Sequence, residues 1–211
     1  GIRDDLVTGV QSGALPIYIK AMLKFHHGSD SLKDRVINVQ GVGNVGRHLV
    51  RQLVDAGAWV NVADISTYNL DQVTKLGRVK VVSNDRVMRM EGDVFAPCAL
   101  GAVLSDSSIP LLRTPIVAGA ANNQLATAAC GDLLHKHGIL YAPDYVINAG
   151  GIIDIHYEQT GYDYEQVCKH VSGIGAQLQQ ICRLSREQNR PTAKVAERLG
   201  EEIIWSKQLV A

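Results

Sequence analysis

Three glycines at positions 41, 43 and 46 and a carboxylate at position 64 have the types and spacing for cofactor chemistry. Gly41 lets the chain turn sharply, Gly43 lets the backbone approach a pyrophosphate, and Gly46 lets a helix pack closely on a sheet. The N-terminus of that helix offers free N–H groups and a partial positive charge to the phosphates. Asp64 can accept hydrogen bonds from both hydroxyls of an adenosine ribose, and its charge would repel a 2′-phosphate. These residues predict a dinucleotide site that binds NAD in preference to NADP.

The residues around the glycines have the pattern of a strand, a turn, a helix and a second strand. Residues 36–39 are mostly β-branched, apolar residues recur at helical spacing over residues 45–54, and Trp59 opens a second apolar run. Gly57 marks the end of the helix. A glycine-rich turn alone also fits a unit that binds no nucleotide and uses its glycines for packing. The flanking elements favour the nucleotide-binding interpretation.

Strands and helices are predicted to alternate beyond this unit. Residues 66–75 have the pattern of a helix, and further apolar runs typical of strands occupy residues 79–82, 94–95, 116–119 and 139–142. This alternation indicates an α/β fold, a Rossmann-type doubly wound parallel sheet with C-terminal helices. Ligands of such sheets bind at the carboxyl ends of the strands, so the loops after these strands should line one crevice.

Amide side chains follow two of the predicted strands. Asn122 and Asn123 come after residues 116–119, and Asn148 comes after residues 139–142. An amide both donates and accepts hydrogen bonds, which suits a ribose hydroxyl or a nicotinamide carboxamide. Each asparagine could instead cap a helix or form a turn. Their shared position at strand ends favours the cofactor role.

The composition excludes several classes of partner. The 211 residues include 21 basic and 21 acidic side chains, so no net charge attracts the chain to nucleic acid or to a membrane surface. No apolar run approaches the roughly 20 residues that cross a bilayer. We therefore expect neither a nucleic-acid partner nor a membrane anchor.

The cysteines are interpreted as reduced thiols of a cytoplasmic protein, because no CxxC spacing occurs among Cys98, Cys130, Cys168 and Cys182. Cys168 with His170, and His135 with His137, lack the second half of a metal site, so no metal is expected. Cys98 has no general base beside it in the sequence. We predict that it packs or contacts a ligand through its backbone and is not a nucleophile.

The two ends of the chain differ from the middle. Residues 1–18 have no helical or strand period and look like a translated cloning scar, with a native but divergent segment as the alternative. Residues 19–163 are predicted to form the NAD-binding domain. Residues 164–211 carry two helical stripes, separated by Pro191, that could cover a sheet edge, reach another domain or contribute to an oligomer contact.

Five blocks of the sequence resemble a known family. In order, they are IKAMLKFHHGSDSLKDRVINVQGVGNVG, NVADI, APCALGA, VAGAANNQLA and YAPDYVINAGGIIDI. They are similar to the amino-acid dehydrogenases that act on leucine, valine, phenylalanine and glutamate, and most closely to the leucine branch. The resemblance implies that the chain is the C-terminal, NAD-binding portion of such an enzyme. It also implies cofactor contacts at Gly41, Gly43, Asn44, Val45, Asp64, Ala99, Asn122 and Asn148.

The reaction implied by the resemblance is reversible oxidative deamination. Hydride leaves the α-carbon of an L-amino acid for the nicotinamide, and water attacks the resulting imine to release ammonia and a 2-oxo acid. The family's side-chain pocket matches Ile152 and Ile155, which share a helical face and suit a branched-chain L-amino acid. Ordinary core packing is the alternative for both isoleucines, and a phenylalanine or valine dehydrogenase is the alternative for the enzyme.

One departure from the family is large. The family's N-terminal domain supplies a catalytic lysine and an aspartate that transfers protons, and no block of this chain matches either. We therefore assign no catalytic residue and expect a chain that is truncated upstream and inactive alone. In the full-length enzyme it would belong to a homo-oligomer. The alternative is a stand-alone NAD-binding module without catalysis.

Overall fold

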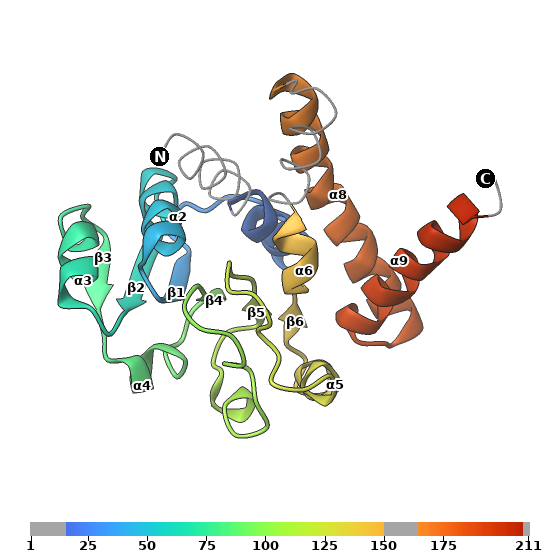
Figure 1. Ribbon diagram of the computed structural model, residues 1–211. Coiled ribbons are helices and arrows are strands. Elements are labelled where there is room, and N and C mark those ends of the chain that lie inside the picture. The colour runs from blue at the N-terminus through green and yellow to red at the C-terminus, as the bar shows by residue number, and fades with distance from the viewer. Residues whose placement is uncertain (1–15, 150–163, 209–211) are drawn as a thin grey trace.

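A computed structural model describes residues 16–149 and 164–208 of the chain (Figure 1). Residues 1–15 of the unusual leader, together with Ile152 and Ile155, lie outside these described residues. Residues 16–27 form a helix, so helical structure is already present three residues before the predicted start of the NAD-binding domain at Ile19. Pro16 is the first described residue of this helix, and Tyr18, also within the segment for which no helical period was predicted, is buried in the core.

The described residues contain one six-stranded parallel sheet in the order β3-β2-β1-β4-β5-β6 (Figure 1). The strands are β1 Val36–Gln40, β2 Trp59–Ala63, β3 Val79–Val81, β4 Val94–Pro97, β5 Ile116–Val117 and β6 Leu140–Tyr141. This order confirms the predicted doubly wound sheet. The direction of winding reverses between β1 and β4, and ligands of such sheets bind outside the carboxyl ends of the strands at this switch point.

Helices connect the strands or, in the case of α6, follow the last strand. They are α2 Asn44–Asp55, α3 Thr67–Thr74, α4 Asn84–Val87, α5 Ala129–Lys136 and α6 Asp144–Ile147, with a 3₁₀ turn at Ile109–Leu111. The helix predicted for residues 66–75 is α3, with Ser66 as its N-cap and Lys75 as its C-cap. The Ser66 side chain accepts a hydrogen bond from the Asn69 N–H, which satisfies one free donor of the first turn.

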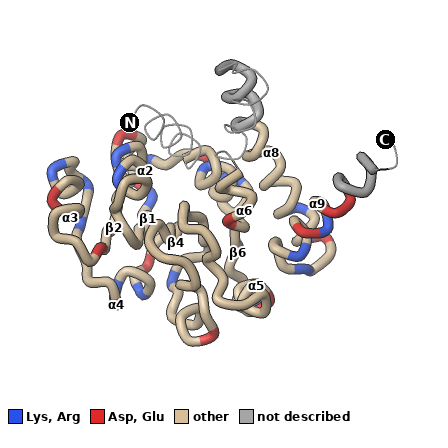
Figure 2. Tube along the Cα trace, viewed as in Figure 1, with Lys and Arg blue, Asp and Glu red and all other residues tan. Residues whose placement is uncertain are grey.

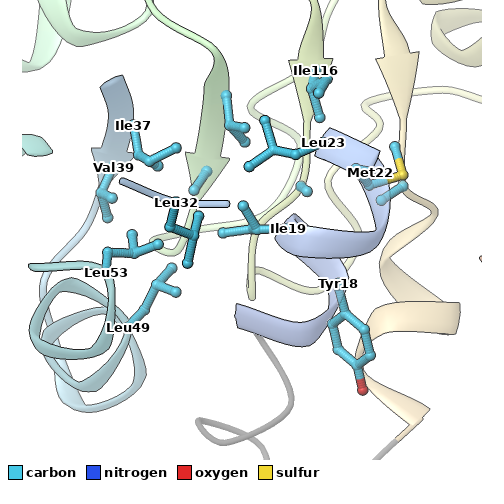
Figure 3. Close-up of a cluster of buried hydrophobic side chains, with 14 of the residues drawn as sticks. Tyr18, Ile19, Met22, Leu23, Leu32, Ile37, Val39, Leu49, Leu53 and Ile116 are labelled. Carbon is cyan, nitrogen blue, oxygen red and sulfur yellow. The ribbon is translucent and has the colours of Figure 1, made fainter. Parts of the chain in front are cut away.

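Apolar side chains cover both faces of the sheet. Val94 and Ala96 of β4 belong to one buried cluster, and Phe95 between them belongs to the other, because successive side chains of a strand point to opposite faces. Figure 3 shows the first cluster, in which side chains of helix 16–27 and α2 meet those of β1. The second cluster joins β4, β5 and β6 to α5. The sheet is therefore a buried central layer.

The two C-terminal helices, α8 Tyr164–Gln188 and α9 Thr192–Gln208, lie beside the β6 edge of the sheet (Figure 1). The buried Thr192 hydroxyl donates to the Tyr141 carbonyl of β6 at 2.6 Å, which ties the start of α9 to the sheet. Within the described ranges, no helix combines the length and the apolar character needed to cross a membrane. Figure 2 shows Lys and Arg interspersed with Asp and Glu over the outer helices.

Candidate cofactor site

The glycine turn after β1 requires glycine at its first position. Gly41 has φ +93°, and a Cβ on it would lie 2.7 Å from the Ala99 Cβ in the loop after β4. The Gly41 N–H donates to the Ala63 carbonyl at 2.7 Å, and the Cys98 N–H donates to the Gln40 carbonyl at 2.7 Å. The carboxyl ends of β1, β2 and β4 are therefore locked together at this turn.

The other two glycines of the motif have opposite surroundings. A Cβ on Gly46 would lie 2.1 Å from the Gly41 carbonyl oxygen, so the close approach of α2 to the turn excludes any side chain. A Cβ on Gly43 would meet no described atom within 4 Å. Gly43 is the N-cap of α2, no side chain caps it in the described structure, and the first turn holds no acidic residue. An uncapped, positively polarised helix end therefore faces open space.

Asp64, directly after β2, is fixed against the glycine turn. Its Oδ2 accepts the Val42 N–H at 2.7 Å, and its Oδ1 accepts the Ser66 N–H at 2.8 Å. The Asn69 side-chain amide lies 3.4 Å from Oδ1 and is a further donor. A carboxylate oxygen can accept more than one hydrogen bond, so the fixed group keeps capacity for hydroxyl donors.

A cavity of about 640 Å³ lies between the glycine turn, Asp64 and the loop after β4. This volume falls in the range of small-molecule sites. The cavity brings together four of the predicted residues, Gly41, Gly43, Asp64 and Ala99. Cys98, for which packing or a backbone contact was predicted, also lines it. The other lining residues were not singled out from the sequence, namely Gln40, Ile65, Ser66, Asn69, Asn84, Leu100, Gly101 and Val103.

Two of the unforeseen lining residues are exposed apolar side chains. Ile65 is 94% exposed and Leu100 is 86% exposed, although both are large and hydrophobic. Exposed side chains of this kind on the wall of a cavity can pack against the faces of a flat ring such as a purine. For Ile65, the signal in the sequence that could have predicted this role is its place as an apolar residue directly after Asp64, at the end of a predicted strand.

Asn122 and Asn148 meet beside the cavity. The Asn148 amide nitrogen donates to Asn122 Oδ1 at 2.6 Å, so the structure pairs two residues predicted to contact the cofactor. Neither is among the residues that line the 640 Å³ cavity. They adjoin it through Gly101, where a Cβ would lie 2.8 Å from the Asn122 carbonyl oxygen. Among the described residues, no hydrogen bond engages the Asn122 amide nitrogen or the Asn148 side-chain oxygen, which leaves a donor and an acceptor for a ligand.

Asn44 and Val45 begin α2. The exposed Asn44 side chain accepts from Arg47 at 3.5 Å, and Val45 packs its partly buried side chain against the first apolar cluster. Both residues therefore offer a ligand their backbone N–H groups at the helix start.

Cys98 is half-buried beside the glycine turn. Burial raises the pKa of its thiol to about 11, and the Ala120 backbone opposes this shift. The thiol is therefore protonated at neutral pH. The backbone N–H of Cys98 donates to the Gln40 carbonyl. Elsewhere in the described residues, no three His, Cys, Asp or Glu side chains converge in a way that could hold a metal ion.

The chain is similar to proteins of known type over most of its length. The model of the Glutamate/Leucine/Phenylalanine/Valine dehydrogenase family matches residues 62–200. The leucine dehydrogenase of Geobacillus stearothermophilus is 41% identical over 186 residues, which are 88% of this chain and 51% of that protein. The L-tryptophan dehydrogenase of Nostoc punctiforme is 41% identical over 187 residues, 88% of this chain and 53% of that protein.

The crystal structure of L-tryptophan dehydrogenase from Nostoc punctiforme superimposes with a TM-score of 0.91 at 38% identity, over 95% of this chain and 60% of that one. The chain spans about half the length of the curated relatives that it matches.

Proposed function

The chain belongs to the glutamate/leucine/phenylalanine/valine dehydrogenase family, and we propose that it is the cofactor-binding part of an NAD-dependent L-amino-acid dehydrogenase. The observation that carries this proposal is the junction of Gly43, the uncapped start of α2 and Asp64 on one cavity. Phosphate needs free N–H donors and close backbone approach, and ribose needs a fixed acceptor. This junction supplies all of them.

The residues around the cavity divide between the parts of a dinucleotide. The N–H groups at Gly43, Asn44 and Val45 would hold the pyrophosphate, and Asp64 would hold the adenosine ribose. Ile65 and Leu100, exposed on the cavity wall, would pack on the adenine. When bound, NAD supplies a nicotinamide ring that accepts a hydride from the amino-acid α-carbon.

The paired amides after β5 and β6 would serve the nicotinamide end. The Asn122 amide donor and the Asn148 carbonyl acceptor match the carbonyl and amide of a carboxamide. Ala99 would contribute contact from the loop after β4, next to Gly41. The cofactor would then span the switch point of the sheet, from Asp64 after β2 to the amides after β5 and β6.

The carboxylate of Asp64 favours NAD over NADP. It is held at the end of β2 by the Val42 and Ser66 N–H groups, so it cannot readily turn away from a bound ribose. A 2′-phosphate at that position would place two negative groups together, which costs free energy. We therefore propose NAD as the cofactor.

We further propose that the full enzyme deaminates L-leucine and other branched-chain amino acids to 2-oxo acids. A leucine dehydrogenase and an L-tryptophan dehydrogenase match the chain at the same 41% identity, so the proposal of a branched-chain substrate rests on Ile152 and Ile155. A pocket that differs by a methylene discriminates by only about 1–3 kcal/mol, so valine and isoleucine should also be substrates.

The proposal assigns the catalytic lysine and the proton-transferring aspartate to a domain outside these 211 residues. The complete enzyme would be a cytoplasmic homo-oligomer involved in branched-chain amino-acid catabolism. This chain alone would bind NAD without turning over substrate, because acid–base chemistry needs a positioned group within reach of the substrate.

The test combines a calorimetric titration of the chain with NAD and an assay of NADH formation from L-leucine. We expect saturable binding of NAD and no turnover. Measurable deamination by this chain would show that the acid–base residues lie within it, and absence of NAD binding would contradict the proposed function itself. A titration with L-leucine separates the enzyme part from a sensor module, since a module that responds to the amino acid should bind it unaided.

A further inference from the structure

Asp144, the first residue of α6, has a buried carboxylate that accepts hydrogen bonds from two sides. The Tyr141 hydroxyl donates to its Oδ1 at 2.7 Å, and the Asn123 N–H donates to its Oδ2 at 2.6 Å. Asp144 is only 9% exposed. Burying a charge is costly unless hydrogen bonds compensate for lost water, so this arrangement needs both donors.

The donor Asn123 has an unusual backbone. Its φ is +52°, in the left-handed region that asparagine tolerates better than most residues. Its N–H is held by Asp144, and its carbonyl accepts the Ala102 N–H at 2.6 Å from the loop that bounds the cofactor cavity. Asp144 therefore fixes the turn that follows β5 and, through it, the end of the loop after β4.

Asp144 also holds the partner of Asn122. The Asn148 N–H donates to the Asp144 carbonyl at 2.8 Å, one helical turn along α6. The Asn148 side chain then reaches Asn122, the residue before Asn123. Asp144 thus restrains both halves of the amide pair: its side chain acts through Asn123, the residue after Asn122, and its backbone carbonyl holds Asn148.

We propose that Asp144 is a positioning residue for the nicotinamide end of the cofactor site. It acts through Asn123 and the Asn122–Asn148 pair and does not itself touch the cofactor. This inference rests on the proposed function, because it assigns that amide pair to the nicotinamide.

The neighbouring tyrosine supports the arrangement. Burial, reinforced by the charge of Asp144, raises the pKa of Tyr141 above its ordinary value, so its hydroxyl stays protonated and remains a donor to the carboxylate. The Tyr141 carbonyl is held in turn by Thr192 of α9. The acceptor that orients Asn123 is therefore anchored on the sheet edge and the C-terminal helices.

The test compares NAD with ADP-ribose, which contains the adenosine and pyrophosphate parts and lacks the nicotinamide. Asp144→Asn keeps the size of the side chain but removes its charge and replaces one of its two acceptor oxygens with an NH₂ group. The new side chain therefore cannot accept from both the Tyr141 hydroxyl and the Asn123 N–H through separate oxygens. The loss of the charged acceptor loosens the turn at Asn123, so we expect NAD affinity to fall about tenfold or more and ADP-ribose affinity by less than about twofold. In Asp144→Ala, the affinities for NAD and for ADP-ribose should change in the same direction as they do in Asp144→Asn.

Tyr145→Phe is the matched control. Tyr145 is the next residue of α6, and its hydroxyl binds the Ala193 carbonyl at 3.0 Å without reaching Asn123. This variant loses one anchor of α6, and we expect the ratio of NAD to ADP-ribose affinity to match that of the wild type. Thermal melting of all variants shows that each is folded before titration.

Two results would overturn the positioning role. Equal loss of NAD and ADP-ribose affinity in Asp144→Asn would show a general structural effect, and unchanged NAD affinity would show that the pair does not depend on Asp144. Failure of the proposed function is distinguishable, because the wild-type chain would then bind neither ligand.

Discussion

At the scale of single residues, the three glycines of the turn are constrained by different neighbours. Gly41 is fixed by its positive φ and by Ala99, and Gly46 by the carbonyl of Gly41. Gly43 has no such protein neighbour in the described structure and an ordinary φ of −64°. Its smallness matters only when a ligand approaches, so substitutions can separate stability from binding.

Gly43→Ala should weaken NAD binding without weakening the fold. The added methyl group enters space that is open in the described structure and that the pyrophosphate would occupy, so we expect an affinity loss of about tenfold or more. Calorimetric titration and thermal melting measure the two effects separately. Gly200→Ala, inside α9 and with equally open surroundings, is the control: it should leave NAD affinity unchanged, and it should not lower the melting temperature, because alanine favours a helix more than glycine does.

Cys98 should react slowly with alkylating reagents near neutral pH. Its pKa of about 11 lies above the ordinary value of 9.0, so the folded chain holds less of the reactive thiolate at pH 8 than the unfolded chain. This difference in pKa corresponds to a thiolate fraction about a hundredfold lower in the folded chain than in the unfolded chain. Mass spectrometry of iodoacetamide-treated protein from pH 7 to 11 would show modification rising toward pH 11. Equal rates at pH 8 in the native and denatured chains would contradict this assignment.

At the scale of elements, two carboxylates perform the same task at different strands. Asp64 follows β2 and holds the Val42 N–H after β1, and Asp144 follows β6 and holds the Asn123 N–H after β5. Each reaches across to the loop of a neighbouring strand. The parallel sheet makes this possible because all its strands end at the same edge. Loops that bind the cofactor are thus fixed by side chains from adjacent loops.

Gly46→Ala tests the packing of α2 on the glycine turn. The new Cβ would lie 2.1 Å from the Gly41 carbonyl oxygen, so α2 must shift. Overpacking of this kind costs about 1–3 kcal/mol, and we expect a lower free energy of unfolding by chemical denaturation together with weaker NAD binding. A variant as stable as the wild type would show that α2 does not pack as tightly as described.

At the scale of the whole molecule, the order of elements was predictable from the sequence, and the contacts between distant loops were not. The glycine spacing, the apolar runs and the carboxylate after the second strand depend on local patterns, and they predicted the doubly wound sheet and the edge where the cavity lies. The left-handed Asn123 and the Asn122–Asn148 pair arise from contacts across more than one strand. No local period encodes such contacts.

The residues that line the cavity were also predictable from the sequence only in part. Asp64 and Gly43 were predicted from spacing, but the exposure of Ile65 and Leu100 depends on which surfaces the folded sheet leaves uncovered. An apolar residue in a sequence is usually assigned to the core. The C-terminal helices were foreseen as helices, and their contact with β6 through Thr192 was one of several open possibilities.

The central claim is that Asp64 and the glycine turn form one NAD site, and the affinity ratio of NADP to NAD tests it most directly. Calorimetric titration of the wild-type chain should give tighter binding of NAD by about tenfold or more, since the carboxylate accepts ribose hydroxyls and repels a phosphate. In Asp64→Ser, NAD should bind more weakly and the preference should shrink toward equality. An unchanged preference in the variant, or equal binding of NAD and NADP by the wild type, would contradict the account.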